Sequence, residues 1–242
     1  MRKHRLLMTL LFLGSLVITP AARAAAPPTP WSDVQRILNG ARVGHPGSGP
    51  SGRVAVAHAY VSRVALGLVA GRHPYGVNEI AIVTQDQQDT VWCVPAATRA
   101  VLSAFITRLP TQRYLSLLEG TDWLGTYLDR VPVVLNHYQA RISYEYRFVF
   151  SVTEYRERVR TDVDMYRAPL IFSVDPRLLP WYRSLGVGAG NHAVVGYGYA
   201  FMPRFAGISV WDPSGLPQAG RHIVGVGALW QAGAPMHHPM VA

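Results

Sequence analysis

The hydrophobic pattern of the chain changes its period near residue 169, and this change constrains the fold more than any other sequence feature. Before it, apolar residues after Cys93 recur at the spacing of one helical face, at Ala97, Ala100, Val101, Ala104 and Phe105. After it, short runs of β-branched and aromatic residues stand between Gly and Pro turns. Helices followed by an antiparallel sheet predict an α+β domain.

The same patterns predict where the individual elements lie. The first helix starts near Cys93, has Pro95 in its first turn, and stops before Pro110. Further helices are predicted at 32–38, 112–118, 124–139 and 153–166, whereas 54–70 is equally consistent with a buried helix or with strands. Strands are predicted at 169–174, 192–200, 207–211 and 222–228.

The N-terminus has the pattern of a secretory signal peptide. Three basic residues precede the apolar run 6–18, and a small-residue stretch with an Ala-x-Ala end follows it. This run of 13 residues is shorter than the roughly 20 that a membrane-spanning helix needs. We therefore expect residues 1–24 to be a signal peptide, cleaved after Ala24 or Ala26, and the mature protein to be secreted.

Composition separates the remainder into two parts. Residues 25–77 contain a Gly- and Pro-rich stretch at 40–52, and we interpret them as an N-terminal extension or pro-like segment with a linker. Residues 78–242 carry the helical and strand patterns described above, so we expect them to form the main domain.

The net charge of +9 does not indicate a nucleic-acid partner. Residues 1–24 hold four of the 23 basic residues and none of the 14 acidic ones, so the mature chain carries 19 − 14 = +5. Its arginines are scattered, and the densest group, at 156–160, is interrupted by Glu157, which predicts a solvent-exposed helix face. We expect neither nucleic-acid binding nor membrane binding after signal cleavage.

Cys93 is the chain's one cysteine, which excludes an intrachain disulfide and a cysteine-based metal cluster. A lone cysteine is often a small buried hydrophobic residue. At the start of a helix, however, free backbone N–H groups stabilise a thiolate and make it nucleophilic. Cys93 is therefore either a core residue or a catalytic nucleophile.

Three other residues could complete a catalytic group with Cys93. Gln87, six positions earlier, could stabilise an oxyanion, and His192 follows a Gly-rich loop at the start of a predicted strand. Asp212 ends the next strand, so it would lie beside His192 if the two strands pair in antiparallel fashion. Each also has an ordinary structural reading, as a loop glutamine, a strand histidine and an Asp-Pro-Ser-Gly turn.

The combined motifs resemble the papain-like cysteine peptidases, in the branch that processes bacteriocin leader peptides (family C thirty-nine-like). The motifs are Gln87-x5-Cys93-Val-Pro-Ala, Asn-His-Ala-Val-Val-Gly-Tyr at 191–197 and Val-Trp-Asp-Pro at 210–213, within about residues 78 to 232. The resemblance implies a papain-like α+β fold and a peptide or protein substrate, with no cofactor or metal. It makes Cys93 the nucleophile, His192 the base, Asp212 the orienting acid and Gln87 the oxyanion residue.

Two departures from the family pattern keep other functions open. Val94 and Asn191 stand where glycine is common, and Val94 could crowd the substrate cleft. The alternatives are a papain-like fold that binds peptide or cell-wall material without turnover, and an acyltransferase that uses an amine in place of water. Transglutaminase-like enzymes, cell-wall amidases and metallohydrolases fit the motifs less well.

The other histidines and the tryptophans receive structural interpretations. We expect His58, His73, His137 and His222 to be structural, and the pair His237–His238 to be a polar tail. Core packing is the expected role of Trp92, Trp181 and Trp211, although each could line a cleft.

Overall fold

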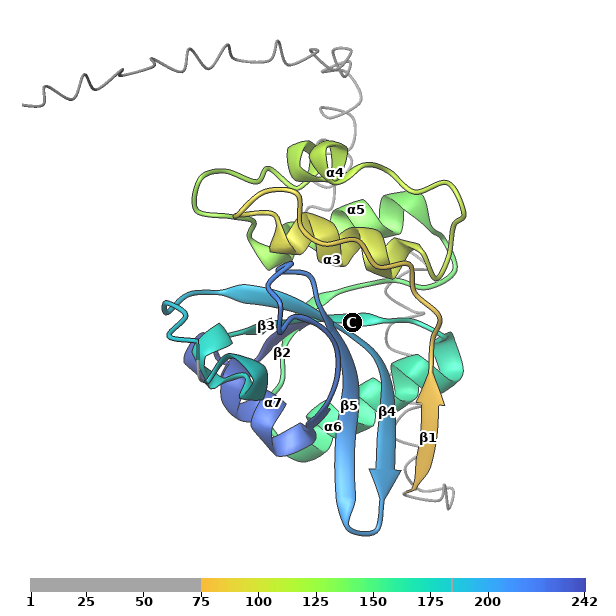
Figure 1. The fold of residues 1–242 in the computed structure, drawn as a ribbon. Helices are drawn as coiled ribbons and strands as arrows, with labels where there is room; N and C mark the ends of the chain where they lie inside the picture. The colour runs from red at the N-terminus through yellow and green to blue at the C-terminus, as the bar shows by residue number, and fades with distance from the viewer. Residues whose placement is uncertain (1–74, 184) are drawn as a thin grey trace, which may run out of the picture. The chain divides into compact units, whose positions relative to one another are not determined.

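The computed structural model describes residues 75–183 and 185–242 (Figure 1). The expected signal peptide, nearly all of the expected extension, and the elements predicted at 32–38 and 54–70 lie outside the described residues, as do His58 and His73. The first described strand, β1 (Gly76–Glu79), spans the expected boundary between residues 77 and 78.

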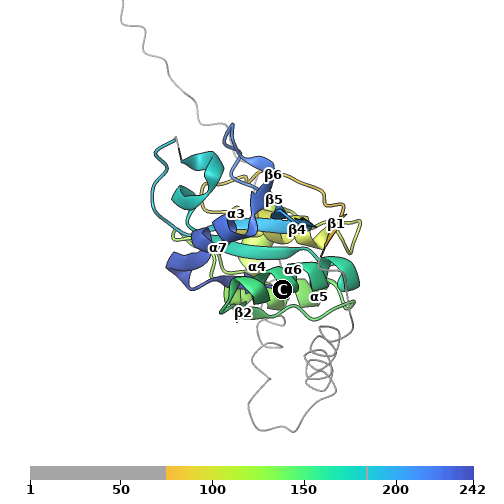
Figure 2. The same cartoon turned by 90° about the horizontal axis from the view of Figure 1, so that it is seen from below.

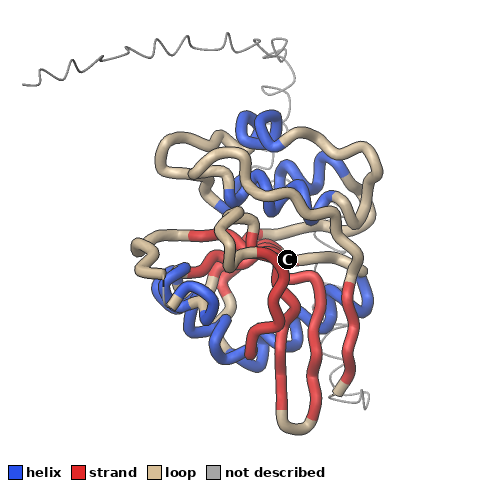
Figure 3. Tube along the Cα trace, in the orientation of Figure 1, coloured by secondary structure: helices blue, strands red, loops and turns tan. Residues whose placement is uncertain are grey.

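Five α-helices occur in the described part of the chain. They are α3 (Cys93–Leu102), α4 (Gln112–Leu118), α5 (Val131–Tyr138), α6 (Val152–Thr161) and α7 (Val226–Gly233). The 3-10 turn η1 (Leu128–Arg130) precedes α5, η5 (Ala234–Met236) follows α7, and a π-helical turn, η2 (Asp162–Tyr166), continues α6. Two further 3-10 turns, η3 (Pro176–Leu178) and η4 (Pro180–Tyr182), stand between the strands at 170–174 and 192–202. In Figure 3 the α3–α5 group lies above the strands, and α6 and α7 lie lower, beside the strands.

The remaining strands build one antiparallel sheet with β1. They are β2 (Tyr146–Phe148), β3 (Leu170–Val174), β4 (His192–Met202), β5 (Phe205–Asp212), β6 (Gly220–Gly225) and β7 (Pro239–Val241). Their order is β2-β7-β3-β4-β5-β6, and β1 pairs with β4 beyond the stretch that β3 occupies. The predicted α+β class, with helices first and an antiparallel sheet afterwards, is confirmed.

Small residues allow α3 to pack closely on the sheet. Ala96, Ala97 and Ala100 are at most 1% exposed, and the helix contacts β3, β4, α4 and α5. Figure 2 shows the same elements from below, with α3 close to β4. Because the whole helix is held between the sheet and two other helices, the position of its first residue, Cys93, is fixed by the core.

Several predicted boundaries are wrong for identifiable local reasons. The first helix ends at Leu102, well before Pro110, because the Ser103 hydroxyl donates to the Ala100 carbonyl and accepts the Val83 N–H. Residues 124–127 are not helical, since Asp122 and Gly125 form reciprocal backbone hydrogen bonds. The predicted strand at 222–228 ends at Gly225, and α7 begins at Val226.

The C-terminal residues are not the polar tail that the sequence suggests. Strand β7 lies between β2 and β3 inside the sheet, and Met240 and Val241 are 0% exposed. His238 stacks on Trp230 with ring centroids 3.4 Å apart. The chain turns into β7 through His237 and His238, which both have positive φ.

The charged face predicted at 156–160 is also wrong. Glu157 and Arg160 form an ion pair whose side chains are 15% and 11% exposed, and the Arg156 guanidinium lies over the Phe201 ring. The alternating charges predict a solvated helix face, but the charged side chains instead make partly buried contacts where α6 packs on β4. Within the described residues, no helix is long and apolar enough to cross a membrane.

Gly196 is required where β3 and β4 pair. A Cβ at this position would lie 2.4 Å from the buried ring of Phe172. We expect Gly196→Ala to lower the free energy of unfolding by about 1–3 kcal/mol through overpacking. Gly227→Ala is the matched control, because a Cβ there meets no atom within 4 Å and alanine favours the helix. Equal stability of the two variants in urea denaturation would contradict this packing argument.

Candidate active site

Cys93 is the first residue of α3, as the sequence predicts, and its side chain is partly buried. The backbone N–H groups of the first turn have no partners within the helix, and the helix dipole adds partial positive charge. The backbone N–H groups of Val94 and Ala193 hydrogen bond to the thiol. This environment favours the thiolate.

The sheet brings His192 and Asp212 together. Strands β4 and β5 are antiparallel neighbours, which is the pairing that the sequence argument required. His192 Nε2 and Asp212 Oδ1 are 2.8 Å apart, and the two side chains are 11% and 0% exposed. The other ring nitrogen of His192 is left for Cys93, with which the imidazole shares a hydrogen bond.

Cys93, His192 and Asp212 form a trio in which hydrogen bonds and charge interactions outweigh the effect of burial on the pKa values. Burial raises the pKa of the Cys93 thiol, but the hydrogen bond and charge of His192 reverse this and lower it. Burial likewise lowers the pKa of His192, but Asp212 and Cys93 raise it above its ordinary value. Both shifts act in the direction of a thiolate–imidazolium ion pair.

Asp212 receives a donor on each oxygen. Oδ1 accepts from the Ser214 backbone N–H at 3.0 Å as well as facing His192, and Oδ2 accepts from the indole N–H of Trp181 at 2.8 Å. Although burial raises the pKa of Asp212, these contacts, led by His192, hold it below its ordinary value. The carboxylate therefore stays charged where solvent does not reach it.

Gln87 lies at the cleft, but its amide hydrogens are engaged. The side-chain nitrogen donates to the backbone carbonyls of Asp89 and Thr90 at 3.0 and 3.1 Å. Its carbonyl oxygen is buried with no hydrogen-bond partner among the described residues. An oxyanion role for Gln87 requires one of these N–H groups to be shared with the substrate, so that role stays a prediction.

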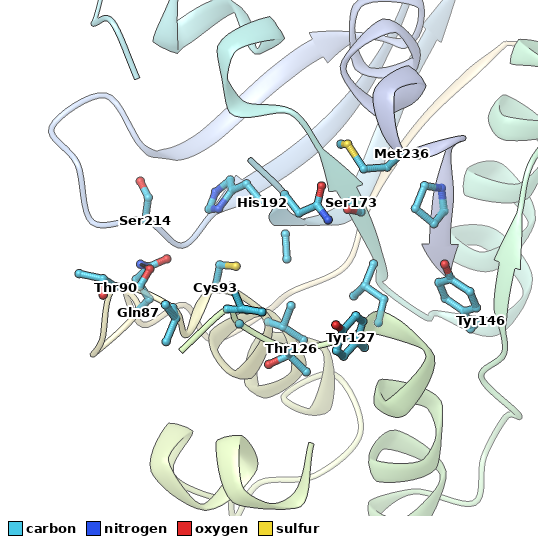
Figure 4. Close-up of a pocket in the computed structure, with 18 of the residues that line it drawn as sticks. Gln87, Thr90, Cys93, Thr126, Tyr127, Tyr146, Ser173, His192, Ser214 and Met236 are labelled. Atoms are coloured by element: carbon cyan, nitrogen blue, oxygen red, sulfur yellow. Dashed lines mark hydrogen bonds between the residues drawn. The ribbon is translucent and has the colours of Figure 1, made fainter. Parts of the chain in front are cut away.

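A cleft of about 640 Å³ is lined by Cys93 and His192, the two members of the trio that can reach a substrate (Figure 4). Gln87, Thr90 and Ser214 lie at one end of it, and Tyr127, Tyr146 and Met236 at the other, with Cys93 and His192 between them. Within the described residues, its lining includes no Asp, Glu, Lys or Arg. The Cys93–His192 pair therefore places charge in a cleft whose other lining residues include no acidic, lysine or arginine side chain.

The two departures from the family pattern both face this cleft. Val94 lines it while being only 4% exposed, and Asn191 lines it from the exposed residue before β4. The Val94 side chain belongs to the core, which limits how far it can reach into the cleft.

Glu119 lies buried close to the nucleophile without adding a charge there. Its side chain is 0% exposed, and burial raises its pKa to about 8, with Thr98 lowering it and Cys93 raising it further. Near neutral pH the carboxyl is therefore protonated, so it does not oppose the Cys93 thiolate.

Sequence reasoning missed the residues that support Asp212. Trp181 was expected to pack in the core, yet its indole donates to the carboxylate and stacks on His222. Nothing in the local sequence distinguishes it, because η4 is brought to Asp212 only by tertiary packing. Trp211, by contrast, is 2% exposed, as expected of a core residue, and His137 is an exposed residue of α5.

No cluster of three or more His, Cys, Asp or Glu side chains able to hold a metal occurs in the described ranges. The exposed His237 lines the cleft, but it has no acidic or thiol neighbour among the other lining residues except Cys93.

No family model matches the sequence, and no curated protein matches it significantly. Many solved structures are similar, including the following three. A candidate C39-like peptidase from Bacillus anthracis has a TM-score of 0.49 and 12% identity, with 69% of this chain and 96% of that chain covered. The peptidase domain of Streptococcus ComA, a bifunctional ABC transporter involved in quorum sensing, has a TM-score of 0.43, 16% identity, and coverage of 70% and 98%. Digestive procathepsin L 3 of Tenebrio molitor has a TM-score of 0.44, 12% identity, and coverage of 71% and 70%.

The lowered pKa of Cys93 predicts rapid alkylation in mild acid. Iodoacetamide should modify Cys93 quickly at about pH 6, where an ordinary thiol of pKa about 8.5 reacts slowly. His192→Ala should slow this reaction by at least about tenfold, because the thiolate loses its cation. Alkylation followed by mass spectrometry across pH gives the profile. A wild-type rate that rises only near pH 8.5 would contradict the ion pair.

Proposed function

We propose that this protein is a cysteine peptidase that hydrolyses peptide bonds. The observation that carries the proposal is the continuous contact from Cys93 through His192 to the fully buried Asp212, at the wall of a cleft. This arrangement supplies a nucleophile, a proton carrier and an orienting carboxylate in the order that acyl transfer needs.

The first half of the reaction forms an acyl-enzyme. The Cys93 thiolate attacks the carbonyl carbon of the scissile bond, forming a C–S bond and moving the carbonyl π electrons onto oxygen. The Cys93 backbone N–H, with Gln87 if one amide hydrogen is released to it, stabilises that oxyanion. When the intermediate collapses, the C–N bond breaks and the imidazolium of His192 gives its proton to the leaving amine.

The second half releases the acid. Neutral His192 takes a proton from water, the resulting hydroxide attacks the thioester carbonyl, and the C–S bond breaks to regenerate the thiolate. Asp212 accepts the hydrogen bond from His192 Nε2 throughout, which keeps the other nitrogen directed at Cys93. An amine that replaced this water would make the protein an acyltransferase.

A second candidate function is peptide binding with little turnover. It is supported by Gln87, whose two amide hydrogens are bonded to the carbonyls of Asp89 and Thr90. A site that keeps these bonds offers the oxyanion fewer donors, which costs about 10²–10³ in kcat where one donor has been removed from such a site.

Hydrolysis of a peptide library separates the two candidates. Cys93→Ala should lower cleavage by at least about 10³-fold, because the covalent route is lost. Gln87→Ala should lower kcat by about 10²-fold if Gln87 stabilises the oxyanion. Iodoacetamide alkylation of Cys93 is the control for Gln87→Ala. Because alkylation forms no oxyanion, its rate should be the same in this variant as in the wild type.

Equal cleavage by the wild type and by Cys93→Ala would overturn the peptidase proposal. Specific peptide binding without cleavage would favour the second candidate. Products extended by an added amine, in place of free acids, would identify acyl transfer.

A further inference from the structure

Trp181 makes a directed contact with the deepest member of the catalytic trio. Its indole N–H donates to Asp212 Oδ2 at 2.8 Å, opposite the oxygen that faces His192. An indole nitrogen can only donate a hydrogen bond, so Trp181 is the donor in this contact and the Asp212 carboxylate is the acceptor. Asp212 is 0% exposed, so solvent water cannot reach its carboxylate and take the place of the indole donor.

The turn that carries Trp181 is anchored on both sides. Leu179 and Tyr182 are 0% and 2% exposed, and the Tyr182 N–H donates to the Leu179 carbonyl at 3.0 Å. The Tyr182 hydroxyl shares a hydrogen bond with the Ser214 hydroxyl, and its ring lies edge-on to His192 with centroids 6.5 Å apart. One short turn, η4, therefore contacts all three of Asp212, Ser214 and His192.

The plane of the indole is fixed from a separate element. His222 on β6 stacks parallel to Trp181, with ring centroids 4.0 Å apart and an interplanar angle of 2°. Because β6 pairs with β5, the strand that ends at Asp212, the stack and the carboxylate share one rigid support. The donor is thus oriented before any substrate binds.

We propose that Trp181 is a positioning residue that holds the Asp212 carboxylate in the orientation at which it supports His192. The proposal rests on the proposed function, since it concerns the same trio. In this role Trp181 does not contact the substrate. Its effect reaches Cys93 only through Asp212 and His192.

Loss of the indole donor would leave a buried oxygen unsatisfied. Asp212 can relieve this by rotating toward another donor or by taking up a proton. Either change weakens its hydrogen bond to His192, destabilises the imidazolium, and lowers the fraction of Cys93 present as thiolate.

The test is a double-mutant cycle on the rate of Cys93 alkylation by iodoacetamide. The four proteins are the wild type, Trp181→Phe, Asp212→Asn and the double variant, each as the full chain. Phenylalanine keeps an aromatic ring on His222 and removes the donor. Alkylation needs no peptide substrate, so the result is independent of whether the protein hydrolyses peptides.

We expect Trp181→Phe to slow alkylation at about pH 6 by about tenfold in the wild-type background and by less than about twofold in the Asp212→Asn background. A residue that acts only through general packing would slow both backgrounds by the same factor. Equal factors, or no change in the wild-type background, would overturn the proposal.

Trp230→Phe is the matched control, because Trp230 also stacks on a histidine, His238, but donates no hydrogen bond to the trio. It should leave the alkylation rate unchanged, and a tenfold loss in this variant would overturn the assignment to Trp181. If Trp181→Phe does not fold, the indole N–H proton of Trp181 is followed by NMR instead. Its resonance should move upfield in Asp212→Asn, and an unchanged shift would overturn the proposal.

Discussion

The hydrogen bond between Asp212 and His192 is the interaction on which the rest of the candidate site depends. It joins the end of β5 to the start of β4, and its carboxylate is completely buried. A buried carboxylate is costly unless donors surround it, and here the Trp181 indole, the Ser214 backbone N–H and the cationic His192 supply that stabilisation. Without Asp212 the imidazolium of His192 would lose its anion, and the Cys93 thiolate would in turn lose its cation.

The fold delivers these groups from elements that are far apart in the sequence. Close packing of an alanine-rich helix on β4 fixes Cys93, antiparallel pairing of β4 with β5 fixes the other two residues, and η4 adds Trp181. The insertion of β7 between β2 and β3 brings His237 and Pro239 to the same cleft. The site is therefore a product of the whole sheet and cannot be assigned to one segment.

Patterns local in sequence predicted much of this arrangement. The helix start at Cys93 and the extents of α4 and β3 follow from periodicity and turn residues. The sequence put Asp212 beside His192 only on the condition that their strands pair in antiparallel fashion, and the structure meets that condition. Contacts between distant segments were not predictable in that way. Trp181 has no local signal for its bond to Asp212, and His237–His238 looked like a tail because β7 is only three residues long. The signal peptide remains a prediction from residues 1–24.

The central claim is that Cys93 and His192 form an ion pair supported by Asp212. An NMR titration of the His192 imidazole tests it most directly, because the ring reports its own protonation. The account predicts that His192 stays protonated well above the ordinary histidine pKa of about 6.5, and that Cys93→Ala lowers its pKa. A His192 that is neutral at pH 7 in the wild type, with no change in Cys93→Ala, would contradict the account.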